Sequence, residues 1–208
     1  MEIYTGVKFK CLQCGNTFPY DERLAHLNDW AFILAGLGLT PVHPGGAYGN
    51  QSCRQGDTSF IITASGMIPE KGLVPENYVL IEGLDQQKGF HVKGVRKPSS
   101  ESLLHYSIYR EFPDTEAIMH GHSRLLEEYA TGLEIPVTRT FQPYGTAALA
   151  ESAVDALREG TDFILLKEHG FVATGKDIDA AGNVVLDYYA KLIAVLKKGR
   201  PCHVSKPM

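Results

Sequence analysis

The sequence predicts one α/β domain, residues 21–208, preceded by a short N-terminal extension, residues 1–20. A chain of 208 residues is long enough to bury one sizeable hydrophobic core. Short apolar runs, typical of buried strands, alternate along the chain with segments whose apolar residues recur every three or four positions, as in amphipathic helices. The run at 59–63 and the segment at 21–39 are clear examples of the two patterns.

Composition and charge narrow the functional classes. The formal net charge of −4 gives no basic surface of the kind that binds nucleic acid. No apolar run approaches the ~20 residues that a membrane-spanning helix needs, so we expect no membrane partner. The N-terminus lacks the charged and then apolar layout of a secretory signal, which predicts a cytoplasmic protein. Four cysteines do not make a disulfide framework in a chain of this size.

The N-terminal extension contains a Cys-x-x-Cys-Gly motif at Cys11 and Cys14, which is typical of a zinc-knuckle hairpin. A structural zinc site needs four ligands, and no second Cys-x-x-Cys motif is present. Cys53, or Cys202 with His203, could complete the site if the fold brought them close. We keep a second metal at Cys11 and Cys14 as a hypothesis, and favour a free-thiol hairpin that packs on the domain.

The elements of the domain follow from periodicity and from glycine and proline. In the segment 21–39, Leu24 and Leu27 belong to one apolar helical stripe, and Gly36 and Gly38 mark its end. Pro98 disfavours helix before it, which places a helix start at the serines that follow. By the same criteria we expect strands at 59–63, 78–82, 90–92, 117–123 and 163–169, and helices at 123–131, 147–158 and 176–198.

Three histidines are placed as ligands of a catalytic metal. His120 and His122 follow an apolar run, and side chains two residues apart on a strand point to the same face. His169 ends a second apolar run, at 163–169. Three histidines at strand ends, with a fourth position left for water or substrate, are typical of catalytic zinc. In the alternative interpretation each histidine is an ordinary hydrogen-bonded residue at the end of a strand.

Three short turns carry donors that suit an anion. The first is rich in glycine, so that backbone N–H groups can approach a ligand closely. The second follows a buried strand, and the third lies at the start of a helix, where hydroxyls and free N–H groups form a phosphate seat. Glu101 comes next in that helix, where a favourable contact with the helix dipole of ~0.3–1 kcal/mol is the simpler explanation from the residues alone. The three turns are Gly49-Asn50, Ser65-Gly66 and Ser99-Ser100.

Five motifs occur in one order along the chain: Gly-Asn-x-Ser-x-Arg, Ile-Thr-x-Ser-Gly, Pro-Ser-Ser-Glu-x-x-x-His, His-x-His-Ser, and a His-Gly pair at a strand end. In this order they resemble the class II aldolase/adducin family, typified by zinc-dependent L-fuculose-1-phosphate aldolase. The resemblance extends from Leu24 to the C-terminus. It implies a three-layer α/β/α sandwich with a largely antiparallel central sheet, and a homotetramer with active sites at subunit interfaces.

The resemblance also implies a reaction and a role for each residue. His120, His122 and His169 would hold Zn²⁺, or another divalent metal such as Co²⁺, Mn²⁺ or Fe²⁺. Glu101 matches the acid/base glutamate of the family, which also approaches the metal. The chain would then be a class II aldehyde-lyase that cleaves or forms a carbon–carbon bond in a small phosphorylated sugar via an enediolate. The positions that match the phosphate contacts of the family are Gly49, Asn50, Ser65, Gly66, Ser99 and Ser100.

One departure from the family pattern keeps other activities open. Family aldolases carry a proton-donor tyrosine a few residues after an Ile-Pro pair, whereas here Ile135-Pro136 leads to Thr140 at that place. Arg139 or Tyr144 could take that role. The alternatives within the fold are a pentulose-phosphate 4-epimerase, a methylthioribulose-phosphate dehydratase and a metal-dependent decarboxylase. A non-catalytic adducin-like interaction module is a further alternative, but retention of the metal histidines argues against it.

Overall fold

The computed structural model of the protein describes residues 6–198. The strands of its main sheet are β1 (Cys11–Gly15), β4 (Gly49–Arg54), β5 (Phe60–Thr63), β6 (Tyr78–Asp85), β7 (Gly89–Lys93), β8 (Ala117–Gly121), β9 (Phe163–Leu166) and β10 (Gly170–Gly175). Two short strands, β2 (Val42–His43) and β3 (Gly46–Ala47), pair separately. The helices are α1 (Arg23–Gly36), α2 (Ser102–Glu111), α3 (Arg124–Glu128), α4 (Ala147–Leu157) and α5 (Ile178–Lys198), with 3₁₀ turns η1 (Pro75–Asn77) and η2 (Thr131–Leu133).

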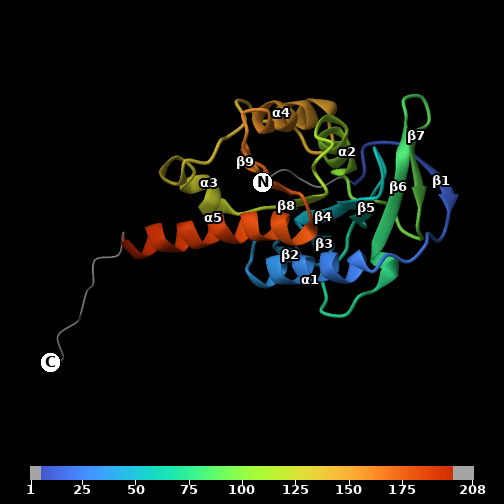
Figure 1. The fold of residues 1–208 in the computed structure, drawn as a ribbon, viewed down its shortest axis with the longest axis horizontal. Coiled ribbons are helices and arrows are strands. Elements are labelled where there is room, and N and C mark those ends of the chain that lie inside the picture. The colour runs from blue at the N-terminus through green and yellow to red at the C-terminus, as the bar shows by residue number, and fades with distance from the viewer. Residues whose placement is uncertain (1–5, 199–208) are drawn as a thin grey trace.

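The main sheet lies between two layers of helices (Figure 1). Across the described residues its strand order is β1-β7-β6-β5-β4-β8-β10-β9. Neighbouring strands are antiparallel except β1 and β7, which run parallel. This arrangement confirms the three-layer α/β/α sandwich with a largely antiparallel central sheet that the sequence predicts.

Both faces of the sheet are covered, which explains why its central strands are apolar at consecutive positions. Helices α1 and α5 cover one face, and α2 and α4 cover the other (Figure 1). In β8, Ala117 and Met119 pack in the core beneath α1 and α5, whereas Ile118 packs in the core beneath α2 and α4. Successive side chains of a strand point to opposite faces of the sheet, so β8 contributes side chains to both cores.

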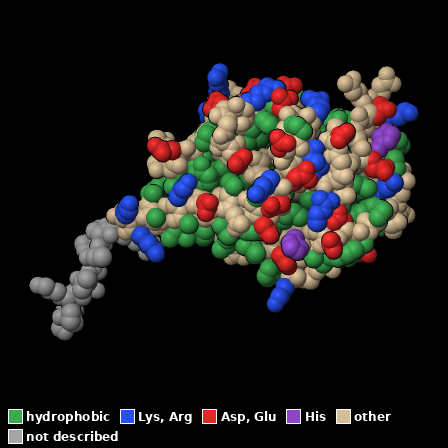
Figure 2. All heavy atoms as spheres, viewed as in Figure 1, with side chains coloured by type: hydrophobic (Ala, Val, Ile, Leu, Met, Phe, Trp, Pro, Cys, Tyr) green, Lys and Arg blue, Asp and Glu red, His purple; other side chains and the backbone are tan. Residues whose placement is uncertain are grey.

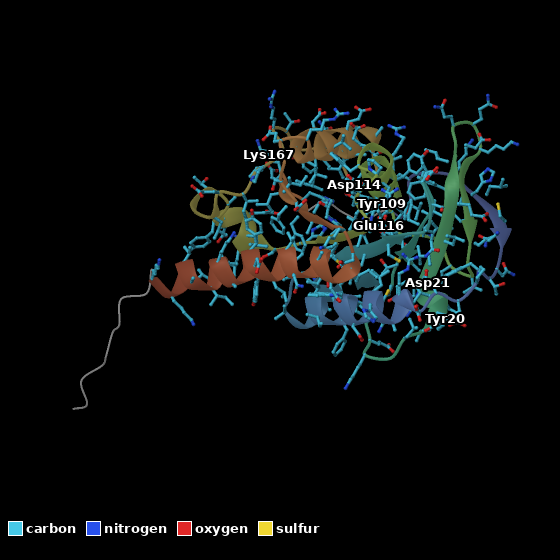
Figure 3. The ribbon with its side chains drawn as sticks, viewed as in Figure 1. Tyr20, Asp21, Tyr109, Asp114, Glu116 and Lys167 are labelled. Atoms are coloured by element: carbon cyan, nitrogen blue, oxygen red, sulfur yellow. The ribbon has the colours of Figure 1, made fainter. Side chains whose placement is uncertain are left out.

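Helix α2 is fixed to the sheet by polar as well as apolar contacts. Tyr109 extends from α2 (Figure 3), and its hydroxyl lies 2.7 Å from Ser52 Oγ on β4. Ser52 Oγ also lies 2.6 Å from Nδ1 of His105, and Arg54 Nη2 donates to the Tyr109 carbonyl oxygen over 2.9 Å. All four side chains are buried. This network holds the helix whose first turn follows Glu101.

The N-terminal segment is not the predicted hairpin. β1 pairs in parallel with β7, so that Cys11 lies opposite Phe90 at the edge of the main sheet. The reason is that an edge strand exposes unpaired N–H and C=O groups, and a further strand satisfies them. Three strands separate β1 from β4, a distance of about 19 Å at the usual strand spacing. Cys53 on β4 therefore cannot share a metal with Cys11.

The other parts of the N-terminal prediction stay predictions. Within residues 6–198, no group of three or more His, Cys, Asp or Glu ligands includes Cys11 or Cys14. Cys202 and His203 lie outside the described residues. The second metal site and the division at residue 20 therefore remain hypotheses.

The surface mixes charges of both signs. Acidic and basic side chains are interspersed over the face shown in Figure 2, with apolar side chains between them along α5. None of the described helices is both long enough and apolar enough to cross a membrane.

Candidate active site

The His120-Gly121-His122 motif lies where β8 ends between two neighbouring strands, β4 and β10. A Cβ atom at Gly121 would lie 2.3 Å from the carbonyl oxygen of Leu39, a backbone atom that cannot move aside cheaply. Only glycine therefore fits between the two histidines. Because glycine allows this close approach of the two backbones, both histidines lie at the end of the strand.

His169 comes from the tight turn between β9 and β10. Glu168 takes the left-handed conformation in that turn, with φ 58°, and the His169 N–H donates to the Leu166 carbonyl oxygen over 3.0 Å. A Cβ at Gly170 would lie 2.3 Å from the carbonyl oxygen of Gly121, so the two backbones meet at the site. β10 was not predicted from the sequence.

The three imidazoles converge on one point. Their ligand atoms lie within 4.8 Å of one another, and their ring centroids are 4.8–5.2 Å apart. Nδ1 of His120 lies 2.8 Å from the Phe171 carbonyl oxygen, a bond that requires the proton on Nδ1 and leaves a lone pair on Nε2. Nε2 of His120 and of His169 are buried without a hydrogen-bond partner in the described structure. These residues fit a divalent metal, whose binding would satisfy both nitrogens.

The electrostatic environment keeps the three rings in the neutral form that binds metal. Burial, followed by the charge of His120, lowers the pKa of His122 to about 3. The pKa of His169 is also lowered to about 3, by burial first and then by His122 and Lys8. Burial likewise holds the pKa of His120 well below its usual value.

These lowered pKa values predict that the metal-free protein loses stability on acidification. An unfolded histidine binds a proton below a pKa of about 6.5, whereas the folded rings of His122 and His169 stay neutral until about pH 3. Their contribution is therefore complete above pH 6.5 and is lost as the pH falls from there toward 3, by about 1.4 kcal/mol per pH unit for each ring. Urea unfolding of chelator-treated protein at pH 7.5, 6.5 and 5.5 measures this slope. A free energy of unfolding that stays constant over this range would contradict it.

Glu101 lies beside the histidines, before the first turn of α2. Its side chain is buried, and Oε1 is 3.6 Å from Nε2 of His169. The Glu101 N–H donates to Ser99 Oγ, and its carbonyl oxygen accepts from the His105 N–H, both over 3.2 Å. The backbone is therefore fixed on both sides, and the carboxylate is positioned to approach a metal or to exchange a proton.

One cavity is lined by every predicted site residue except the two cysteines. Two of its turns need glycine: Gly49 has φ 144° and Gly66 has φ 70°, and at both a Cβ would crowd backbone atoms. Asn50 is 5% exposed, and its Oδ1 has no hydrogen-bond partner in the described structure, which suits a ligand. The predicted residues in the lining are Gly49, Asn50, Ser65, Gly66, Ser99, Ser100, Glu101, His120, His122 and His169.

The lining also includes side chains that were not predicted as site residues. His43 lies in β2 and Tyr48 directly follows β3, with ring centroids 4.4 Å apart, and the Tyr48 ring lies 5.7 Å from the ring of His122. Glu168 lines the cavity from the β9–β10 turn. The Pro44-Gly45 pair, which forms the turn between β2 and β3, is the sequence signal for the hairpin that brings these rings together.

Tyr144 also lines the cavity, whereas Arg139 is exposed and does not. The Tyr144 hydroxyl donates to the Gly6 carbonyl oxygen over 3.2 Å. Nζ of Lys8 donates to the Tyr144 carbonyl oxygen over 3.0 Å and lies 3.5 Å from the centre of its ring. Gly6 and Lys8 therefore hold Tyr144 in the wall of the cavity.

The fold and the site together define the class of this protein: a largely antiparallel α/β/α sandwich that carries three histidines able to bind a metal ion. A family described as the class II aldolase and adducin N-terminal domain matches residues 33–127 and 124–192. The chain belongs to this class II aldolase/adducin family.

Several known proteins are similar to this chain. A methylthioribulose-1-phosphate dehydratase from Methylococcus capsulatus is 31% identical over 197 residues, 81% of this chain and 91% of that protein. A 5-methylthioribulose-1-phosphate/5-deoxyribulose-1-phosphate aldolase from Rhodospirillum rubrum is 34% identical over 170 residues, 74% of this chain and 72% of that protein. A solved structure of an L-fuculose 1-phosphate aldolase has a TM-score of 0.68 at 27% identity and covers 91% of this chain and 92% of its own.

Proposed function

We propose that this protein is a divalent-metal-dependent enzyme that cleaves or forms a carbon–carbon bond in a small phosphorylated sugar. The observation that carries the proposal is that three converging imidazoles and Glu101 share one cavity with three turns rich in hydroxyl and N–H groups. The names of the aldolases similar to this chain support it.

Different residues of the chain would have different roles in such a reaction. His120, His122 and His169 would hold the ion, and a divalent metal would supply Lewis-acid stabilisation of the negative charge that develops beside a carbonyl carbon. Glu101 would take a proton from the substrate hydroxyl and return it to carbon. The three turns would hold the phosphate, and binding energy remote from the reacting bond would orient the substrate.

A methylthioribulose-phosphate dehydratase is the second candidate. Thr140 stands where the resemblance leads us to expect a tyrosine, and it is exposed and absent from the cavity lining. The segment that leads to it packs along β9, where the Thr138 N–H donates to the Leu165 carbonyl oxygen over 2.9 Å. The similar Methylococcus capsulatus protein carries the name of a dehydratase, which supports this candidate.

A substrate comparison on zinc-loaded protein tests the proposal. We expect carbon–carbon bond formation from dihydroxyacetone phosphate and a small aldehyde, detected by coupled consumption of the aldehyde. Loss of water from methylthioribulose 1-phosphate without any aldehyde product would favour the second candidate. Protein that holds no divalent metal after metal-replete purification and transforms no phosphorylated ketose would favour the interaction module.

We also propose that copies of this chain form a homotetramer, as the resemblance implies, and that the protein is cytoplasmic. The end of helix α1 supports the assembly because Phe32 and Ile33, together with Leu37 directly after the helix, are exposed at 43%, 40% and 36%. A second cavity shares His122 and His169 with the candidate site, so a neighbouring copy could reach it there. Sedimentation measures the number of subunits.

A further inference from the structure

The candidate phosphate site contains no cationic side chain in its described lining. The cavity is lined by hydroxyls, amides, glycines, histidines and two glutamates, and by no lysine or arginine. A phosphate group carries close to two negative charges at neutral pH, and removing it from water is costly without a compensating charge. A cation just outside the lining would meet this need.

Arg96 lies directly behind one of the three turns. Its Nη2 donates to the Ser65 carbonyl oxygen over 2.9 Å, and its Nη1 donates to Oδ1 of Asn77. A Cβ built on Gly66 would lie 3.6 Å from Nη2, so the guanidinium is in contact distance of this turn. Both acceptors are neutral oxygens, and Arg96 forms no ion pair with any of residues 6–198. The half-buried guanidinium of Arg96 is therefore fixed by two hydrogen bonds, and no carboxylate among the described residues neutralises its charge.

The turn in front of Arg96 has capacity for a ligand. The N–H of Ser65 donates to the Lys97 carbonyl oxygen, and the N–H of Met67 donates to that of Ala64. The N–H of Gly66 between them has no hydrogen-bond partner among residues 6–198. A backbone donor in the lining and a guanidinium behind it together form the surroundings that an anion prefers.

We propose that Arg96 is a positioning residue that supplies positive charge to the substrate phosphate from behind the Ser65-Gly66 turn. This inference rests on the proposed function, because it assigns the phosphate to these turns. The two hydrogen bonds hold the guanidinium against the turn, and its charge acts on the phosphate through the intervening backbone at the low effective dielectric of a buried site. Arg96 does not touch the reacting atoms.

Calorimetric titration of the zinc-loaded protein with inorganic phosphate tests the inference without requiring turnover. We expect Arg96→Met to weaken phosphate binding at least tenfold, because Coulomb's law at an effective dielectric of about 20 gives a tenfold effect even at a separation of about 12 Å. Arg96→Lys, which keeps the charge, should recover most of the affinity. Arg110→Met removes the same charge from the exposed end of α2 and should bind phosphate as the native protein does. On a phosphorylated ketose, Arg96→Met should raise KM and leave kcat nearly unchanged.

The phosphate affinities of the native protein and of the two Arg96 variants decide whether the inference holds. Native affinity in Arg96→Met overturns the inference, and so does an equal loss in Arg96→Met and Arg96→Lys, which would mean that the residue only bridges two loops. Native protein that binds no phosphate overturns both this inference and the proposed phosphate site. If phosphate binding changes as expected but no ketose phosphate is transformed, the proposed reaction fails and the role of Arg96 stands.

Discussion

Replacing His120 with alanine is expected to remove the metal from the protein and, with it, all measurable turnover. His120 is the most constrained of the three ligands, because Nδ1 bonds to the Phe171 carbonyl oxygen and Nε2 is buried beside the other two rings. Loss of an outer partner of a metal ligand already weakens metal binding by about 10–100-fold, so loss of the ligand itself should exceed about 100-fold. Metal content after dialysis, measured by mass spectrometry, and competition with a chelating dye give the affinity.

The control for this prediction is His26→Ala, which removes an exposed histidine from α1. It should bind one metal ion per chain with native affinity. His120→Ala also leaves the Phe171 carbonyl oxygen without its donor, at a cost of about 1–3 kcal/mol, so circular dichroism must show that the variant is folded. A folded His120→Ala protein that retains stoichiometric metal would show that the imidazoles do not form the site.

The local parts of the site could be predicted because their geometry depends on a few consecutive residues. His120 and His122 project together because they are two residues apart at the end of a strand, and Ser99 precedes a helix because Pro98 disfavours helix before it. Apolar runs such as Phe163–Leu166 predict buried strands in the same way. The convergence of these residues on one cavity depends on pairing between strands far apart in the chain. Apolar periodicity does not predict that pairing, and the family resemblance did.

The parts that could not be predicted are those decided by tertiary contacts. β10 follows β9 after a turn in which Glu168 takes a left-handed conformation that sequence preference does not favour for glutamate. A Cys-x-x-Cys motif has the same local signature in a zinc hairpin and in a lone strand. The segment at Cys11 pairs with the free edge of β7, a contact that the residues around the motif do not specify. The contact between Gly6 and Tyr144 likewise depends on where that pairing places the N-terminal segment.

Changing Glu101 to glutamine is expected to lower kcat by about 10²–10⁴-fold, the range typical of a missing general acid/base, while the metal is retained. Glutamine keeps the size of the side chain and removes its ability to take a proton. The three imidazoles remain, so metal content should stay near one ion per chain. KM for the ketose phosphate should change little, because the phosphate turns do not involve this carboxylate. Steady-state kinetics and metal analysis on the same preparation separate the two effects.

Glu111→Gln is the matched control, because it makes the same substitution at the other end of α2. There the carboxylate pairs with Arg158 on the surface over 2.7 Å, an exposed ion pair whose loss should change stability little and activity not at all. Full turnover by metal-loaded Glu101→Gln on the best substrate would remove the carboxylate from the chemistry. The fall in kcat with constant metal content is thus the result that distinguishes an acid/base role from a ligand role, since a residue needed only to hold the ion would lower both together.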